Sequence, residues 1–419
     1  MKKQLLVVVY DVGAAGPVDI ATAARDTCDL VFVCDPTDPH TAAHLDQMHQ
    51  AGTVVALDDP DAEAVAKVAT ALGADGLTTF SEYQIRLTAA AAAECGLRFH
   101  GPTTAALLTD KYEQRRALRD AGIESTLFAA IDSLGDLESA LSIVGVPAVL
   151  KPRNGAASVD TFLVESAAQG RAFLQDNDSA FILEEFLAGD PLAAGPAWGD
   201  LVSVESLVVD GRVHSSHLTG KLPLAPPFRE TGQFAPATLD REWSERVVAL
   251  AESALAALDF RWGTAHTELK LTPSGPRVIE VNGRLGGYVG DVHRRAGGPD
   301  LLGASIAVAL GLPLPDAEAD YDRVAFRHYV AAPPYQARLD GIEGLDRVGD
   351  LPGVTLVEPR AEVGQILDWR KGTQECLAVV YGAAADHGEL AQTLRRIAET
   401  VRPAYTRTAA HETTEETRW

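Results

Sequence analysis

Short apolar runs alternate with helical patterns along the first hundred residues of the chain. A short apolar run bounded by turn residues predicts a buried β-strand, and apolar residues three or four positions apart predict a helix. Strands are expected at 5–10, 30–34, 53–57 and 76–80, and helices at 17–26, 60–72 and 82–95. This alternation favours a parallel sheet wrapped by helices.

The pattern changes after a helix expected at 110–121. Further strands are expected at 147–152, 161–164 and 181–187, with helices at 134–144 and 166–175. Two hairpins follow, one joining 201–209 to 212–218 through Asp210-Gly211 and one joining 265–271 to 277–281. Amphipathic helices are expected at 242–258 and, within a last α+β segment from 321 onward, at 387–400.

The second hairpin carries the most informative polar pattern. Glu280 and Asn282 are two apart, so on a strand they point to the same face, and Glu268 lies on the partner strand. Two carboxylates and an amide oxygen are hard ligands that suit Mg²⁺ shared with substrate phosphates. The alternative is a polar, solvent-facing strand edge. The apolar residues that flank Glu280 favour a buried setting, where carboxylates need a cation.

Arg284 follows Asn282 by two positions and falls on the same side of the predicted strand. A guanidinium presents two parallel N–H donors, which fit a carboxylate or an acyl phosphate better than a single ammonium does. Arg284 is therefore a candidate for holding an anionic substrate group.

Overall charge limits the partners. The 59 acidic and 36 basic residues give a formal net charge of −23, which repels nucleic acid and anionic membranes. No apolar run approaches the roughly 20 residues of a membrane helix. The four cysteines have neither zinc-site nor disulfide spacing, so we expect reduced thiols and a cytoplasmic protein. Such an acidic chain would also repel a nucleotide, so a phosphate site must carry local cations.

Two lysines are candidates for those cations. Lys151 ends an apolar strand and precedes a Gly/Ala/Ser loop at 155–158, whose N–H groups could face a phosphate. Lys111 begins a predicted helix and could supply a second charge. Each lysine taken alone is more often a solvated surface residue.

Two acids, Glu184 and Glu185, interrupt the apolar residues of the strand expected at 181–187. This is unusual for a plain buried strand. It is explained by an edge strand whose backbone and one carboxylate read an adenine.

The order of these pieces resembles the ATP-grasp superfamily. The resemblance covers residues 1 to about 320, and its joint pattern is specific although each piece is weak: Asp110-Lys111, Lys151-Pro152, the strand end 184–187, Glu268, and Glu280-Val281-Asn282-x-Arg284. Within the superfamily the chain is most similar to the L-amino acid ligases that make dipeptides, on the segments 79–82, 204–211 and 228–233 and the region from about 321.

The resemblance implies roles for individual residues. ATP would be held by the phosphate-side residues Lys111, Lys151 and Ser158 and the adenine-side residues Glu184, Glu185, Phe186 and Leu187. Two Mg²⁺ ions, for which Mn²⁺ could substitute, would be bound by Glu268, Glu280 and Asn282. Lys151 and Arg284 would act in catalysis, Arg284 on the reacting carboxylate. Glu230 would hold a substrate ammonium, and Gln233 lies at a substrate position that is commonly histidine in the dipeptide-forming relatives.

The implied fold is α/β and α+β. It has an N-terminal Rossmann-like domain at 1–108, a small ATP-grasp lobe at 109–187, a large lobe with the metal site at 188–320 and a C-terminal α+β lid at 321–419. The implied reaction joins a carboxylate to an amine through an acyl phosphate and releases ADP and phosphate. The expected partners are therefore small-molecule carboxylates and amines, with neither nucleic acid nor membrane, and a homodimer stays open.

Three alternatives remain. The chain could be another ATP-grasp ligase, of the nucleotide-pathway or carboxylase type, or a nucleotide-binding protein without catalysis. An NAD-dependent enzyme is disfavoured because Gly13 and Gly16 do not complete a G-x-G-x-x-G pattern. The sequence also leaves open whether His293, Arg294 and Arg295 reach a substrate or lie on the surface.

Overall fold

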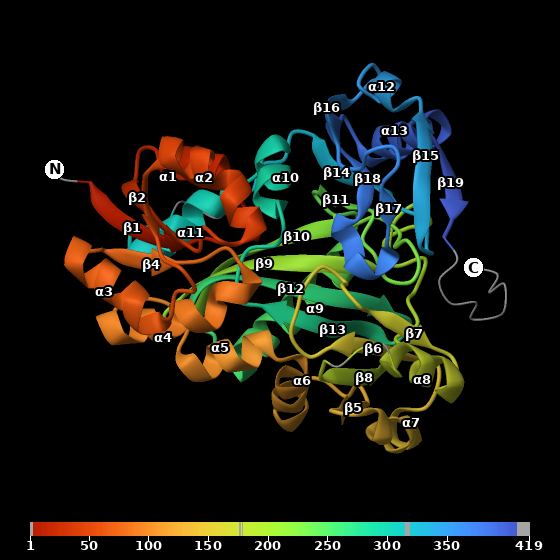
Figure 1. Ribbon diagram of the computed structural model, residues 1–419, viewed down its shortest axis with the longest axis horizontal. Helices are drawn as coiled ribbons and strands as arrows, with labels where there is room; N and C mark the ends of the chain where they lie inside the picture. Colours follow the sequence, from red (N-terminus) through yellow and green to blue (C-terminus); the bar gives the residue numbers. More distant parts are fainter. Residues whose placement is uncertain (1–2, 176, 178, 315–318, 409–419) are drawn as a thin grey trace.

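The computed structural model describes residues 3–175, 177, 179–314 and 319–408, whose strands form four sheets (Figure 1). Residues 409–419, the end of the predicted C-terminal domain, lie outside this part. No helix within the described ranges has the length and apolar character needed to cross a membrane. All four cysteines are free thiols.

The predicted N-terminal parallel sheet is present, with the strand order β3-β2-β1-β4. Its strands are β1 (Gln4–Val9), β2 (Cys28–Cys34), β3 (Thr53–Ala56) and β4 (Gly76–Thr78). One face packs on α1 (Pro17–Ala24), α2 (Pro39–Ala51) and α11 (Leu301–Leu310), and the other on α3 (Ala62–Leu72) and α4 (Ile85–Cys95). Burial on both faces explains why these strands read as continuous apolar runs.

A second sheet of four antiparallel strands has the order β5-β8-β6-β7. Its strands are β5 (Phe128–Ile131), β6 (Ala148–Pro152), β7 (Phe162–Val164) and β8 (Phe181–Glu185). The expectation that the strand at 181–187 forms a sheet edge is wrong. Strand β5, which the sequence pattern did not reveal, pairs with β8 on the side away from β6.

Helices surround this small sheet and link it to the N-terminal one. They are α5 (Pro102–Thr109), α6 (Lys111–Asp120), α7 (Leu137–Val144) and α8 (Ala167–Gln175), with the short 3₁₀ turn η2 (Leu134–Asp136). Another 3₁₀ turn, η1 (Glu82–Gln84), precedes α4 in the N-terminal region. Helix α6 begins at Lys111 because the Asp110 side chain accepts hydrogen bonds from the backbone N–H groups of Tyr112 and Glu113.

The largest sheet has eight strands in the order β13-β12-β9-β10-β11-β14-β18-β16. Both predicted hairpins lie in it, and its strands are β9 (Leu201–Val209), β10 (Arg212–Lys221), β11 (Gly232–Ala235), β12 (Trp262–Thr272), β13 (Gly275–Asn282), β14 (Val324–Ala331), β16 (Val354–Pro359) and β18 (Cys376–Ala384). The long predicted helix is α9 (Arg241–Ala257), and α10 (Val289–Arg295) contacts β11 and β14.

The chain from residue 321 onward does not form a separate sheet at its start, because β14 pairs with β11 and so continues the large sheet. A small sheet of the order β17-β15-β19 follows, built from β15 (Ala337–Glu343), β17 (Ile366–Leu367) and β19 (Arg402–Arg407). The remaining elements are α12 (Leu345–Val348), η3 (Trp369–Gln374) and the predicted last helix, α13 (His387–Thr400). The predicted domain boundaries at 108, 187 and 320 stay predictions.

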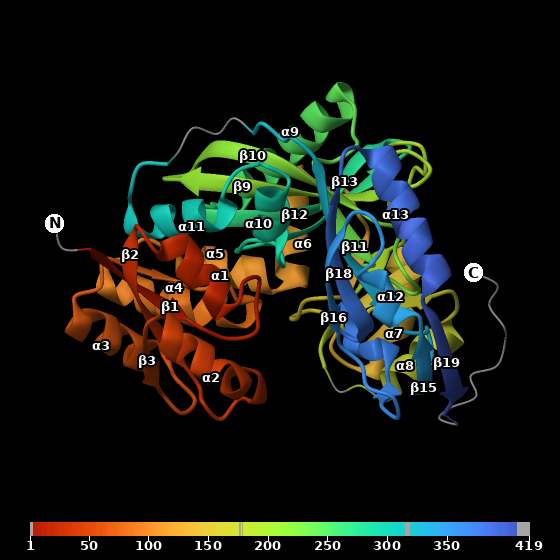
Figure 2. The same ribbon diagram turned by 90° about the horizontal axis from the view of Figure 1, so that it is seen from above.

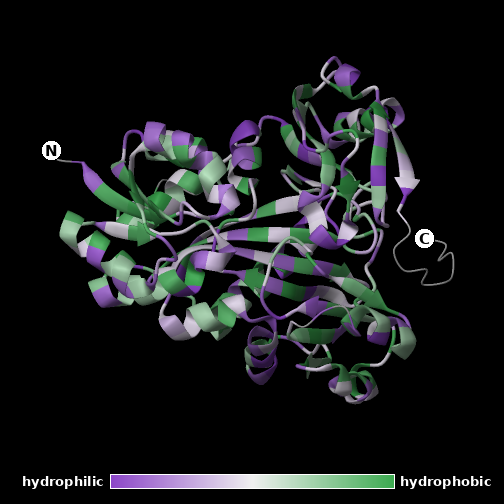
Figure 3. Cartoon of the chain, in the orientation of Figure 1, coloured by the Kyte–Doolittle hydropathy of each residue, from purple (hydrophilic) through white to green (hydrophobic). Residues whose placement is uncertain are grey.

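Strand register places a row of polar side chains on one face of the eight-stranded sheet. Glu280 is opposite Glu268 at one end of the row, and Gln233 is opposite Lys221 and Arg327 towards the other. In Figure 3 the N-terminal strands are mostly green, whereas the strands of this sheet are interrupted by purple and pale residues. Figure 2 shows β9, β10 and β12 running from the N-terminal helices towards the C-terminal ones. The row itself crosses these strands, from β13 to β14.

Candidate active site

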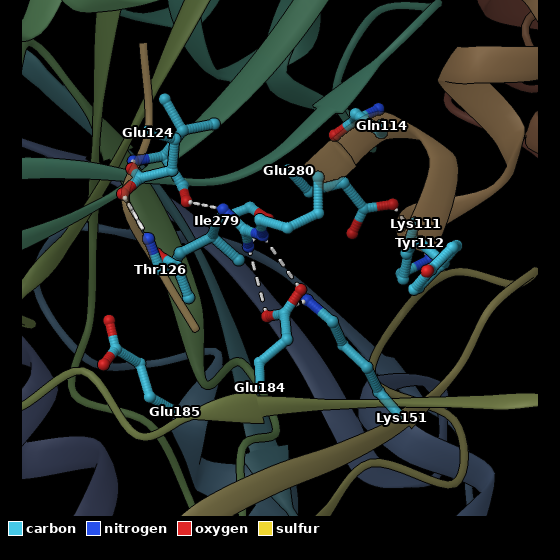
Figure 4. A network of polar contacts seen from close by, with 12 residues as sticks. Lys111, Tyr112, Gln114, Glu124, Thr126, Lys151, Glu184, Glu185, Ile279 and Glu280 are labelled. Atoms are coloured by element: carbon cyan, nitrogen blue, oxygen red, sulfur yellow. Dashed lines mark hydrogen bonds and ion pairs between the residues drawn. The ribbon is translucent and has the colours of Figure 1, made fainter. Parts of the chain in front are cut away.

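Glu184 on β8 is the centre of a buried cluster of charges (Figure 4). Its carboxylate accepts two hydrogen bonds from the Arg115 guanidinium, at 3.0 and 3.1 Å, and lies 2.8 Å from the Lys151 ammonium. Burial alone would raise the pKa of Glu184, but Arg115 and Lys151 outweigh it and lower the pKa to about 2. Glu184 is therefore ionised and fixed by two cations.

Arg115 also joins the small sheet to the large one. Its remaining donors reach the carbonyl oxygens of Val278 and Ile279 on β13, at 2.6 and 2.9 Å. Glu124 adds a second link, because its carboxylate accepts a hydrogen bond of 2.8 Å from the Val278 N–H. These contacts hold β13, and with it Glu280, against helix α6.

Lys111, the first residue of α6, meets Glu280 at 2.9 Å, and each side chain is 13% exposed. The ammonium also donates to the Gly155 carbonyl oxygen at 2.6 Å. Burial would lower the pKa of Lys111, but the neighbouring Glu280 outweighs it and raises the pKa. The two predicted lysines thus belong to one cluster, each paired with a predicted acid.

Glu268 and Glu280 are register partners on β12 and β13. His266 lies between Glu205 and Glu268, with ring nitrogens 2.7 and 3.1 Å from their carboxylates. Burial alone would lower the pKa of His266, but Glu205 outweighs it and raises the pKa to about 9. Burial likewise opposes ionisation of Glu268, but the hydrogen bond from His266 lowers its pKa to about 2. Burial also opposes ionisation of Glu205, but His266 outweighs it and lowers the pKa of Glu205, so both carboxylates of this His266 group are ionised.

The third predicted metal ligand, Asn282, donates to the His266 carbonyl oxygen at 3.3 Å and accepts from Arg284 at 3.4 Å. Within the described ranges, no three His, Cys, Asp or Glu side chains are arranged to hold a metal by themselves. Ionised carboxylates and an amide oxygen on neighbouring strands nevertheless fit the oxygen chemistry of Mg²⁺, with phosphate oxygens completing the shell.

Arg284 is held by a residue to which the sequence assigned no role. Its Nε lies 3.1 Å from the carboxylate of Glu82, in the 3₁₀ turn η1 of the N-terminal region. Glu82 is 7% exposed, and burial raises its pKa against the opposing effect of Arg284. The contact joins the N-terminal region to the loop that follows β13, so it orients Arg284 from outside its own loop.

Glu230 and Gln233 meet at a second unassigned residue, Lys221 on β10. The Lys221 ammonium is 2.9 Å from Glu230 and 3.4 Å from the Gln233 side-chain oxygen. The lysine side chain is only 4% exposed; burial would lower its pKa, and Glu230 outweighs this and raises it. The sequence pattern assigns Lys221 no role, because the strand expected at 212–218 ends before it, whereas β10 extends to Lys221.

Ser158 lies in the loop after β6, where Ala157 and Ser158 both have a φ of 58°, a strained value for residues with a side chain. The Ser158 hydroxyl donates to the Phe228 carbonyl oxygen at 2.9 Å. The loop also contacts η3, since the Thr373 N–H donates to the Ala157 carbonyl oxygen at 2.9 Å. The loop is thus fixed between the segment of Glu230 and the C-terminal region.

The remaining predicted residues make other contacts. The Glu185 side chain points away from Lys151 (Figure 4) and is 3.4 Å from Arg277. Phe186, which is 37% exposed, and Leu187 follow the end of β8. His293 is fully buried between Thr219 and Tyr321, whereas Arg294 and Arg295 form ion pairs with Asp291 of their own helix.

Comparison with known proteins identifies the class to which this site belongs. Residues 108–288 match the ATP-grasp domain family, and this range contains the charged clusters around Glu184, Glu268 and Lys221. Residues 108–288 therefore form an ATP-grasp domain, as the motifs predict.

Individual proteins narrow the comparison. The chain is 27% identical over 333 residues to alanine–anticapsin ligase of Bacillus subtilis strain 168, covering 69% of this chain and 70% of that protein. It is 29% identical over 335 residues to human carnosine synthase 1, covering 74% of this chain and 40% of that protein. The solved structure of an L-amino acid ligase from Bacillus licheniformis has the same fold, with a TM-score of 0.77, 23% identity and coverage of 97% and 99%.

Proposed function

We propose that the protein is an ADP-forming carbon–nitrogen ligase, which phosphorylates a carboxylate with ATP and transfers the acyl group to an amine. The observation that carries this proposal is the meeting of Lys111 with Glu280 and of Lys151 with Glu184 at one buried site. Phosphoryl transfer needs cations and oxygen ligands at the same place. The ligases to which the chain is similar support the same reaction.

In the proposed reaction, Lys111 and Lys151 exchange their carboxylate partners for phosphate oxygens of ATP. Glu268, Glu280 and Asn282 would hold Mg²⁺, which when bound neutralises charge on the transferred phosphoryl group. Arg284, oriented by Glu82, holds the carboxylate whose oxygen attacks the γ-phosphorus. The loop of Ser158 covers the phosphate and excludes water from the acyl phosphate.

The proposed substrates are an amino acid, whose ammonium is held by Glu230, and an amine or second amino acid. Glu230 is suited to this role because its side chain is 24% exposed while Lys221 fixes one of its oxygens. The adenine contacts of Glu184, Glu185, Phe186 and Leu187 and a cytoplasmic location belong to the same proposal. Glu184 would then bind adenine while still paired with Arg115.

The products of ATP and the fate of a labelled oxygen test the reaction. Purified protein is mixed with ATP, Mg²⁺, pairs of amino acids and other amines, and released nucleotide is identified. We expect ADP, because attack occurs at the γ-phosphorus. A carboxylate labelled with ¹⁸O should pass one label to the released phosphate. AMP with pyrophosphate, or label-free phosphate formed together with amide, would contradict the proposed reaction.

A further inference from the structure

The turn η3 of the C-terminal region reaches into the proposed site, although it lies outside the range 108–288 that matches the ATP-grasp domain family. It contacts the loop at 155–160, which connects β6 to β7. The loop begins beside Lys111, whose ammonium donates to the Gly155 carbonyl oxygen at 2.6 Å. The proposed reaction places this loop over the phosphates of ATP, and it assigns no role to η3.

Two hydrogen bonds join η3 to this loop. The Thr373 N–H donates to the Ala157 carbonyl oxygen at 2.9 Å, and the Asp160 N–H donates to the Arg370 carbonyl oxygen at 2.9 Å. Between the two bonds lies Gly372, whose φ of 73° is in the left-handed region. A Cβ atom on Gly372 would overlap the Ala157 carbonyl oxygen. Glycine therefore allows the backbones of the turn and the loop to approach this closely.

The loop backbone is strained where η3 holds it. Ala157 and Ser158 each have a φ of 58°, and Asp160 has a φ of 49°, values that residues with a side chain rarely adopt. Such conformations persist where the surrounding contacts determine them, and they are frequent at ligand clamps. For Ala157 and Asp160 these contacts come from η3. The position of the loop thus depends on the C-terminal region.

Thr373 also contacts the segment that carries Glu230. Its hydroxyl oxygen accepts a hydrogen bond of 3.0 Å from the Glu230 N–H, while Lys221 lies 2.9 Å from the Glu230 carboxylate. Thr373 is only 6% exposed, so both of its contacts are shielded from water. One buried residue therefore joins the loop proposed to cover the phosphates to the segment proposed to bind the ammonium, through its N–H and its hydroxyl respectively.

We propose that Thr373 is a positioning residue that couples nucleotide binding to the ammonium site. When the loop closes on ATP, Thr373 orders the segment of Glu230 without any contact between that segment and the nucleotide. Such coupling is reciprocal, so an amino acid bound at Glu230 also favours the closed loop. ATP would then be enclosed mainly when the ammonium site is filled, which limits its hydrolysis by water. This inference rests on the proposed ligase reaction and names a residue that links two parts of its site.

Hydrogen exchange measures this coupling without an amino-acid substrate, because it reports local opening of each segment. The full chain is incubated with Mg²⁺ and the non-hydrolysable ATP analogue AMP-PNP, and exchange is followed at 155–160 and at 228–231. In the wild type, the nucleotide should slow exchange at least about tenfold in both segments. Thr373→Val keeps the N–H bond to Ala157 but loses the hydroxyl, so protection at 228–231 should fall about three- to tenfold, the effect of one hydrogen bond. Protection at 155–160 should stay within about twofold.

Thr373→Ser restores the hydroxyl and should behave as the wild type. Lys371→Met is the matched control within η3, since the Lys371 side chain is 62% exposed and pairs with Glu375, and it should leave protection in both segments unchanged. If Thr373→Val does not fold, Gly372→Ala tests the same contact, because its methyl group meets the Ala157 carbonyl oxygen and should lower protection in both segments.

Three results would overturn the inference. Full protection at 228–231 in Thr373→Val would assign the coupling to the direct hydrogen bond of Ser158 to the Phe228 carbonyl oxygen. Equal losses in both segments of Thr373→Val would mean that Thr373 only supports the fold. A wild type in which the nucleotide protects 155–160 alone, or unchanged protection in Gly372→Ala, would show that the two segments are independent. Absence of protection at 155–160 in the wild type would instead contradict the proposed function.

Discussion

The two ends of the polar row differ in how their charges are balanced. At the end near β13, each buried cation has a carboxylate within hydrogen-bonding distance, as in the Lys111–Glu280 and Lys151–Glu184 pairs. At the β14 end, Arg327 is buried against tyrosine rings, and its Nε and Nη1 atoms have no hydrogen-bond partner among the described residues. A ligand at the first end must therefore replace existing ion pairs.

The paired charges near β13 fit the nucleotide proposed for that end. A nucleotide with bound Mg²⁺ brings both negative phosphates and positive metal, so it can exchange partners with lysines and acids together. Lys221, which is paired with Glu230 between the two ends, marks the boundary.

The largest expected effect follows from removing the charge of Glu280, which lies opposite Glu268 on the neighbouring strand. Glu280→Gln removes a charge while keeping the shape, so ADP release should fall at least about 10³-fold through loss of roughly 4 kcal/mol of transition-state stabilisation. Circular dichroism should show an unchanged fold. The exposed residue Glu94 provides the matched control, and Glu94→Gln should retain activity. Near-normal turnover by Glu280→Gln would show that Glu280 is not a ligand of the metal.

A second prediction concerns stability at the same end. Glu184→Gln leaves Arg115 and Lys151 buried without a carboxylate, and we expect a loss of about 3 kcal/mol in the free energy of unfolding at neutral pH. The folded-state pKa of Glu184 is lowered from 4.5 to about 2, so its contribution is complete above pH 4.5 and is lost as the pH falls towards 2.

Denaturant unfolding of wild type and Glu184→Gln across this pH range measures the effect. The difference between them should be constant at neutral pH and shrink in acid. Glu138→Gln is the control, because the Glu138 side chain is 77% exposed in its pair with Arg171 and should show no measurable difference. A Glu184→Gln difference that does not change with pH would mean that Glu184 contributes through packing alone.

The sequence predicted the site residues at the β13 end of the polar row better than those at its β14 end. Glu268, Glu280 and Asn282 could be placed on one face because a hairpin and the two-residue period of a strand are local features. The ATP-grasp recognition from these motifs is confirmed. The individual site roles stay predictions.

What the sequence missed depends on distant partners. Arg115 is 69 residues from Glu184, and Glu82 contacts Arg284 from another part of the chain. Strand β5 has only four residues, and α2 buries little beyond Thr41 and Met48, so their patterns were weak. Arg327 lies in an apolar strand, where only the register with Gln233 and Tyr381 reveals its place in the row.

A smaller effect is expected from a substitution of Glu230, which pairs with Lys221 between the two ends of the polar row. Glu230→Gln keeps an acceptor for Lys221 but removes the charge proposed to hold an ammonium, so KM for the amino acid bound there should rise about tenfold. KM for ATP should stay within about twofold. Initial rates measured while each substrate is varied in turn would show this. If KM rises equally for all substrates, Glu230 supports lobe closure or folding and does not contact the ammonium.

The smallest effect is expected at Gln233, which joins Lys221 to the loop of Tyr288. Its amide oxygen accepts from Lys221 at 3.4 Å, and its N–H₂ donates to the Gly287 carbonyl oxygen at 2.7 Å. Gln233→Glu retains the first contact and loses the second, whereas Gln233→Leu loses both. If the hydrogen bond to Gly287 positions the amine substrate, Gln233→Glu should already raise the KM for that amine about three- to tenfold, which is the effect of losing one hydrogen bond. The KM for ATP should not change. Because Lys221 keeps its acceptor in Gln233→Glu, a rise confined to Gln233→Leu would assign the role to Lys221 and leave the loop without one.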